Sequence, residues 1–93
     1  MGTGEDVLLV DIRTPAEVAQ AAIPGALHIP MHLLPVRASE LPKDKDVILY
    51  CRSGARSYHA CRFLTENGYD NMVNLRGGII AWARHGYEIG SLG

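Results

Sequence analysis

Cys51 is the residue whose type and sequence neighbours point most clearly to chemistry. It follows an apolar run, residues 47–50, and opens the segment Cys51-Arg52-Ser53-Gly54-Ala55-Arg56-Ser57. Gly54 permits unusual backbone dihedrals, so the N–H groups of this segment can turn inward as an anion-binding nest. A helix predicted to begin near Ser57 adds its positive N-terminal end, and Arg52 and Arg56 add full charges. Each feature favours thiolate over thiol, so we expect a lowered pKa for Cys51.

A thiolate in an anion-binding cradle is suited to attack a sulfur atom in an anionic donor. The same N–H groups would then hold the persulfide that forms on Cys51. For a lone cysteine, a buried structural role would be the preferred interpretation. Here the preceding strand, the loop and the following helix agree, so we interpret Cys51 as a sulfur-handling nucleophile.

Alternating strands and helices are predicted to position this loop. Four apolar runs predict strands over residues 7–10, 26–29, 47–50 and 72–75, and the first and third are nearly continuous, as in buried parallel strands. Helices are predicted from Pro15 up to the Pro24-Gly25 turn, and over residues 33–41, 57–67 and 79–85. We therefore expect an α/β fold with a four- or five-stranded, mostly parallel sheet and helices on both faces. Cys51 should then lie at the carboxyl edge of a central strand, where such sheets bind ligands.

Local signals mark where several of these elements begin and end. Thr14 can cap a helix whose first turn contains Pro15, and Glu17 completes a capping box. Gly68 stands where a left-handed helix cap belongs, and Gly77-Gly78 predicts a tight turn that serves the fold rather than the chemistry.

The chain length, the net charge and the number of cysteines limit the possible domain organisation and partners. A chain of 93 residues suffices for a single domain, residues 1–93, with one core. Its net charge of −1 provides no basic field for nucleic acid or an anionic membrane, and no apolar stretch is long enough to span a bilayer. The N-terminus shows no export signal, and two cysteines are few for a secreted scaffold, so we expect free thiols and a cytoplasmic location. His28 and His32 are separated by Pro30 and join no Cys/His cluster, so neither a metal nor a cofactor is expected.

Further motifs accompany the Cys51 loop along the chain. They are Leu9-Val10-Asp11-Ile12-Arg13, Ile23-Pro24-Gly25-Ala26 with Ile29-Pro30, and Leu75-Arg76-Gly77-Gly78 with Ala81-Trp82 and Gly86. In this order and spacing, over about residues 7–86, the chain resembles the rhodanese family, which includes single-domain thiosulfate sulfurtransferases.

The resemblance implies a double displacement in which Cys51 is the nucleophile and the persulfide carrier. The donor would be thiosulfate or a similar anion, and sulfite would leave. A thiophilic acceptor, such as cyanide, a thiol or a protein, would then take the sulfur. Arg52 and Arg56 would orient the donor, and the backbone of the whole loop would bind the sulfur through Ser53, Gly54, Ala55 and Ser57.

Two departures from the family pattern stand out. Ala21-Ala22 occupies the place where many relatives have Gly-His, and we expect this to alter a turn and a surface contact rather than the chemistry. Fewer residues than usual precede Val7, so we expect either a trimmed chain or an exposed sheet edge.

Two other functions use a similar loop. A sulfur-carrier or interaction module would receive sulfur from a protein partner and show little activity on small donors. A phosphatase or arsenate reductase is the third class, but the phosphatase loop is one residue longer than the Arg52-to-Ala55 stretch between Cys51 and Arg56. The shorter loop fits one sulfur atom better than a tetrahedral phosphate, and no general-acid aspartate lies beside it.

Several other residues have an ordinary structural role as the alternative to a functional one. Asp11 is expected to support the loop through hydrogen bonds or an ion pair with an arginine, whereas Arg13 is expected to be a solvated surface charge. Cys61 and Trp82 are expected to be packing residues. Arg56, beside the helix start, is expected to be the inner and more important arginine, and Arg52 is expected to point outward to the pocket mouth.

Overall fold

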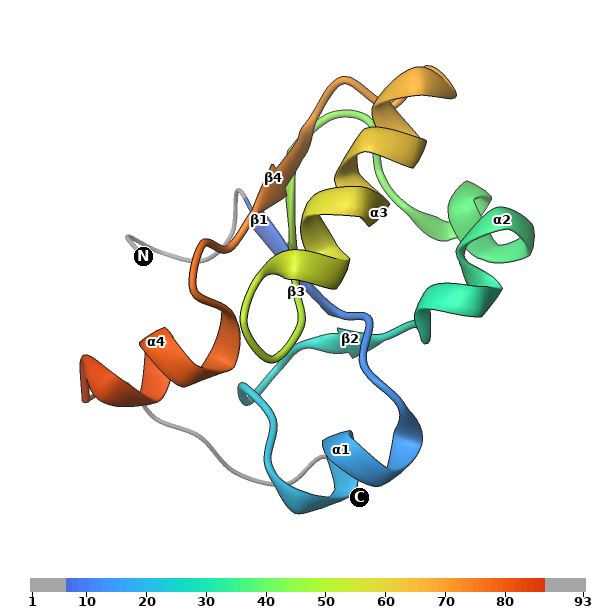
Figure 1. Cartoon of the computed structure of the whole chain (residues 1–93). Coiled ribbons are helices and arrows are strands. Elements are labelled where there is room, and N and C mark those ends of the chain that lie inside the picture. Colours follow the sequence, from blue (N-terminus) through green and yellow to red (C-terminus); the bar gives the residue numbers. More distant parts are fainter. Residues whose placement is uncertain (1–6, 87–93) are drawn as a thin grey trace.

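The fold is a parallel sheet with helices on both faces, described by a computed structural model for residues 7–86 (Figure 1). The strands are β1 (Val7–Asp11), β2 (Leu27–His28), β3 (Asp46–Tyr50) and β4 (Met72–Asn74). They form a four-stranded sheet in the order β2-β1-β3-β4, and every neighbouring pair is parallel. This confirms the predicted fold class and places β3 inside the sheet. Residues 1–6 and 87–93, which the expected domain includes, lie outside the described part.

The helices connect these strands. They are α1 (Pro15–Gln20), η1 (Met31–Leu33), α2 (Leu34–Arg37), η2 (Ala38–Glu40), α3 (Ala55–Glu66) and α4 (Gly78–Arg84), where η denotes a 3₁₀ turn. The single helix predicted over 33–41 is therefore divided into one α-helical turn between two 3₁₀ turns. Pro35 has no N–H to donate, so it cannot continue the 3₁₀ turn that precedes it. No helix within residues 7–86 has the length and apolar character needed to cross a bilayer.

The predicted capping box at the start of α1 is present. Thr14 Oγ1 accepts from the Glu17 N–H at 3.3 Å, and Glu17 Oε1 accepts from the Thr14 N–H at 3.1 Å. These reciprocal bonds satisfy N–H groups that the first helical turn leaves free. The capping box also fixes the Glu17 carboxylate beside the helix start.

Alternate residues along β3, and Cys51 directly after it, belong to two separate hydrophobic clusters. Val47, Leu49 and Cys51 join the larger cluster, which lies under α3 and includes Leu64. Tyr50 points to the opposite face and joins a smaller cluster with Ile79 of α4. Trp82 packs against this second cluster, as predicted. Side chains of a β-strand alternate between faces, so this pattern shows that helices cover both sides of the sheet.

Candidate active site

Cys51 lies directly after β3, at the carboxyl edge of an inner strand, as the sequence predicted. The residue is 1% exposed, and its thiol is free. The chain turns sharply after it and enters α3 through Gly54, which has φ of 103°. This left-handed conformation is costly for other residues, and it lets α3 begin at Ala55, two residues earlier than predicted.

Hydrogen-bond donors from the loop surround the Cys51 sulfur. The Gly54 N–H donates to Sγ at 3.1 Å, and Ser57 Oγ lies 3.5 Å from Sγ. Burial alone would raise the pKa of Cys51. Hydrogen bonds from the Ser57 hydroxyl and from the N–H groups of Ser57, Gly54 and Ser53 outweigh it and lower that pKa. The predicted direction is therefore confirmed, and the main favourable cause is hydrogen bonding rather than arginine charge.

The start of α4 holds the carbonyl side of the same loop. The Ile79 N–H donates to the Cys51 carbonyl at 3.0 Å, and the Ile80 N–H donates to the Arg52 carbonyl at 3.2 Å. A Cβ on Gly78 would lie 2.4 Å from the Arg52 carbonyl oxygen, so no other residue fits there without movement. Gly78 is thus needed for a close approach to the loop as well as for the turn that the sequence indicated.

Asn74, the last residue of β4, joins the loop from a neighbouring strand. Its Nδ2 donates to the Gly54 carbonyl at 3.3 Å, and its Oδ1 accepts from Ser57 Oγ. Ser57 Oγ also lies 3.2 Å from the Gly54 carbonyl oxygen. Sequence reasoning missed Asn74, although a polar residue at the end of an apolar strand beside Gly77-Gly78 was a usable signal.

Arg56 contacts Glu17 of α1. Its two terminal nitrogens donate to the two carboxylate oxygens, each at 2.9 Å. The hydrogen bonds from Arg56 hold the pKa of Glu17 at about 2, and the same pairing raises the pKa of Arg56. The side chain of Arg56 is 39% exposed, so the arginine expected to be the inner one is only partly desolvated. The pair connects α1 to the start of α3.

The rest of the loop faces outward. Arg52, Ser53 and Ala55 are exposed, whereas Gly54 and Ser57 are buried. Within residues 7–86, the Arg52 side chain makes no hydrogen bond or ion pair. The loop therefore presents its backbone to the sulfur and one unpaired cation to solvent.

Asp11 and Arg13 form a buried ion pair at the end of β1. Asp11 is 0% exposed, and Arg13 donates to its carboxylate through Nε at 2.9 Å and through Nη2 at 2.7 Å. Arg13 also donates to the Ala21 carbonyl and lies over the Tyr50 ring. The expectation that Arg13 is solvated is therefore wrong, because a carboxylate, a carbonyl and an aromatic ring together replace its water. Asp11 binds Arg13 rather than a loop arginine. Ala22, next to this pair, is fully buried and offers no surface contact.

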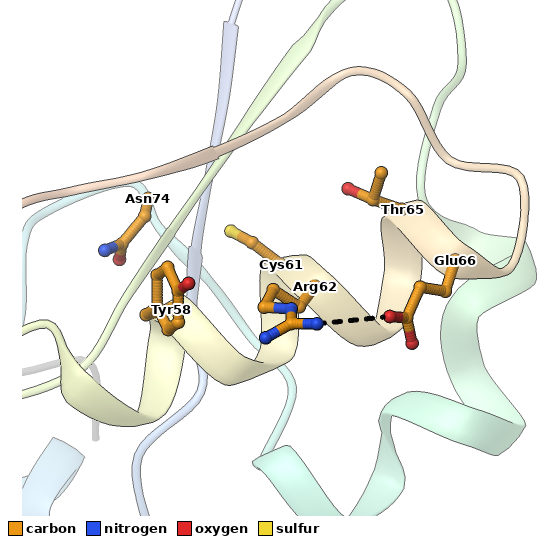
Figure 2. A pocket seen from close by; sticks show the side chains of 6 residues that line it. All are labelled: Tyr58, Cys61, Arg62, Thr65, Glu66 and Asn74. Carbon is orange, nitrogen blue, oxygen red and sulfur yellow. Dashed lines mark ion pairs between the residues drawn. The ribbon is translucent and has the colours of Figure 1, made fainter.

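Among the described residues 7–86, one hollow lies at the end of β1 and another along α3, and Cys51 lines neither of them. One, of about 330 Å³, lies between the end of β1 and η1, with Arg56 at its edge. The other, of about 410 Å³, follows α3 and is shown in Figure 2. Asn74 reaches the end of this second hollow from β4, beside Tyr58 of α3 (Figure 2).

The second cysteine and the histidines show no reactive arrangement. Cys61 is half-buried beside the core and lines the hollow along α3, and burial raises its pKa to about 11. His28 Nε2 lies 2.8 Å from the Arg13 carbonyl oxygen. In the described part of the chain, no three His, Cys, Asp or Glu residues gather in a way that could hold a metal ion.

Comparison with known proteins agrees with this arrangement. The family model of the rhodanese-like domain matches residues 1–85. A sulfurtransferase of Allochromatium vinosum is 71% identical over 85 residues, which cover 91% of this chain and 79% of that protein. The crystal structure of a rhodanese-related protein from Thermoplasma volcanium has a TM-score of 0.85 at 32% identity, over 91% of this chain and 84% of that one. A rhodanese-like domain protein from Staphylococcus aureus has a TM-score of 0.80 at 34% identity, over 99% and 82%. With its parallel sheet and its buried cysteine at the carboxyl edge, the chain belongs to the rhodanese-like sulfurtransferase family.

Proposed function

We propose that this chain transfers sulfane sulfur through a persulfide on Cys51, with thiosulfate or a similar anion as donor. The supporting observation is the buried Cys51 sulfur, which receives the Gly54 N–H at 3.1 Å and lies among further loop donors. Such donors stabilise negative charge on sulfur without needing to reorganise during the reaction. They suit both the thiolate and the terminal sulfur of a persulfide.

The reaction has two displacement steps. The Cys51 thiolate attacks the outer sulfur of thiosulfate, a new S–S bond forms, and the old S–S bond breaks with its electron pair leaving on sulfite. The product is the anion Cys51–S–S⁻. A thiophilic acceptor such as cyanide or a thiolate then attacks the terminal sulfur, and the electron pair of the breaking S–S bond returns to Cys51.

The loop residues have different roles in the proposed reaction. Backbone N–H groups of Ser53, Gly54 and Ser57 hold the sulfur, and the exposed Arg52 meets the anionic donor at the mouth. Arg56 acts mainly through Glu17, by fixing the start of α3 and the field around the loop. Ala55 contributes backbone only. The free thiols that this chemistry needs fit a reducing compartment such as the cytoplasm.

Mass spectrometry after incubation with thiosulfate tests the proposal. We expect a gain of one sulfur atom on Cys51, its removal by cyanide, and no gain in Cys51→Ser. Cys61→Ser is the matched control and should load normally, because Cys61 lies outside the loop and its pKa is raised. Absence of loading from thiosulfate together with loading from a protein persulfide would refute the small-donor assignment. That outcome would identify a sulfur-carrier module instead.

A further inference from the structure

The Ser57 hydroxyl has one proton and three acceptors within reach. Its oxygen is fully buried and lies 3.5 Å from Cys51 Sγ, 3.2 Å from the Gly54 carbonyl oxygen, and within hydrogen-bond distance of Asn74 Oδ1. A serine hydroxyl donates only one hydrogen bond at a time. The acceptor that takes this proton therefore determines what Ser57 offers to the sulfur.

The orientation of the Asn74 amide is fixed by its second contact. Asn74 Nδ2 donates to the Gly54 carbonyl at 3.3 Å, which leaves Oδ1 facing Ser57. The reversed amide would bring two carbonyl oxygens together and lose this bond, so the hydrogen-bond network selects the observed orientation. Asn74 thus presents an acceptor to Ser57 and competes with the sulfur for its proton.

We propose that Asn74 is a positioning residue that holds the Ser57 proton away from the Cys51 sulfur in the thiol state and yields it when the sulfur becomes an anion. In the thiol, S–H donates to Ser57 Oγ, and Ser57 donates to Asn74 Oδ1. When the thiol loses its proton to solvent, the thiolate becomes a charged and stronger acceptor, so the Ser57 hydroxyl turns to it. Asn74 is half-buried, so water can then replace Ser57 at Oδ1.

This exchange has a consequence for the reactivity of Cys51. Each ionisation costs one Ser57–Asn74 hydrogen bond, so Asn74 keeps the pKa of Cys51 above the value that the loop donors alone would set. Nucleophilicity of a thiolate falls as its pKa falls, so this restraint preserves attacking strength at the proposed sulfur-transfer site. The role for catalysis rests on the proposed function, whereas the effect on ionisation does not.

The charged groups around Cys51 are independent of this exchange. Arg56 of α3 is paired with Glu17 of α1, and Arg13 is paired with Asp11 at the end of β1. Arg52 is exposed on the loop, and β4 itself contains no charged residue. An uncharged substitution of Asn74 therefore leaves the charges that face Cys51 in place.

The test is the pH dependence of Cys51 alkylation by iodoacetamide, measured with Cys61→Ser in every variant. Asn74→Leu removes one of the two acceptors that compete with the sulfur and leaves the Gly54 carbonyl, and it should lower the pKa of Cys51 by about half a unit to one unit, the equivalent of one hydrogen bond. The Gly54 carbonyl keeps its bond from the Tyr58 N–H at 3.0 Å in this variant. Asn74→Asp offers a stronger acceptor and a negative charge, so it should raise the pKa. A loosened loop would move both variants in the same direction.

Ser57→Ala provides the matched control for mechanism. Without the Ser57 hydroxyl, Asn74→Leu should leave the pKa of Cys51 unchanged, whereas the charge of Asn74→Asp should still raise it. If Asn74→Leu fails to fold, Asn74→Ala should give a smaller decrease, because water can accept the Ser57 proton there. An increase or no change on removing the amide, or a decrease that persists without Ser57, would overturn the proposal. Sulfur loading from thiosulfate on the same proteins tests the proposed function separately.

Discussion

Replacing Glu17 by glutamine should destabilise the fold by breaking the ion pair that connects α1 to the active-site loop. Glu17 accepts two hydrogen bonds from Arg56, both at 2.9 Å, and these bonds, together with smaller contributions from Thr14, lower the pKa of Glu17 from an ordinary 4.5 to about 2. Glutamine keeps the size of the side chain and loses the charge. The variant therefore removes the charge of the contact and one of its two acceptor oxygens, while one oxygen remains for the capping box.

The size of the effect follows from the pKa shift and from solvent exposure. A fall from 4.5 to about 2 corresponds to at most about 3 kcal/mol of stability. The two side chains are 29% and 39% exposed, so solvent screening reduces this to about 1 kcal/mol. For a domain of this size, that loss lowers Tm by about 4–8 °C. Because the folded-state pKa is depressed, the contribution is complete above pH 4.5 and disappears as the pH falls towards 2.

Thermal unfolding followed by circular dichroism at pH 7 and at pH 3 measures the effect. Glu40→Gln is the matched control, since Glu40 pairs with Arg37 at comparable distances on an exposed surface far from the loop. We expect a clear decrease in Tm for Glu17→Gln at pH 7, a smaller one for Glu40→Gln, and a difference between Glu17→Gln and the wild type that is smaller at pH 3 than at pH 7. Equal effects of the two substitutions, or a difference that does not shrink at pH 3, would refute this reasoning.

Three further expectations concern the loop. Cys51→Ser should abolish sulfur transfer while Cys61→Ser largely preserves it in a thiocyanate assay; comparable losses would show that Cys61 takes part. Gly78→Ala should raise the pKa of Cys51 and reduce sulfur-transfer activity, because the added Cβ would lie 2.4 Å from the Arg52 carbonyl oxygen. Gly68→Ala is the control: its Cβ would lie in open space, so it should only lower stability, by about 1 kcal/mol for its positive φ. Equal activity of the two glycine variants would contradict the role given to Gly78. Arg56→Ala should raise the pKa of Cys51 and reduce kcat/KM for thiosulfate more than Arg52→Ala does. The several-fold effect of Arg52→Ala on kcat/KM should weaken with added salt. Steady-state kinetics at two ionic strengths measure both effects, and a larger loss for Arg52→Ala would reverse the ranking of the two arginines.

Most of the fold could be predicted from patterns among residues that are close in sequence. The apolar runs, the Thr14–Glu17 capping box and the position of Cys51 after β3 depend on residues close in sequence. Their hydrogen bonds and periodicities are set within a few positions, so sequence alone predicts them.

Contacts between distant segments were beyond the sequence patterns. Arg56 and Glu17 come from different helices, and Asn74 meets Ser57 only because β4 pairs with β3. Arg13 lies two positions from its partner Asp11, and it is buried because the Ala21 carbonyl and the Tyr50 ring lie against it. Tertiary packing therefore determines the partners of Arg56 and Asn74 and the burial of Arg13.

The two hydrogen bonds from α4 to the carbonyls of Cys51 and Arg52 can form only late in protein synthesis. Cys51 lies near the middle of the described part of the chain, whereas the Ile79 and Ile80 N–H groups that bind its loop lie near the end of that part. A growing chain therefore exposes Cys51 from the ribosome before Ile79 and Ile80 can bind the loop. Until they do, these two bonds to the loop carbonyls are missing, and we expect the Cys51 thiol to keep a pKa closer to that of an ordinary cysteine. The surroundings of Cys51 are therefore completed only after nearly all of the described part of the chain has been synthesised.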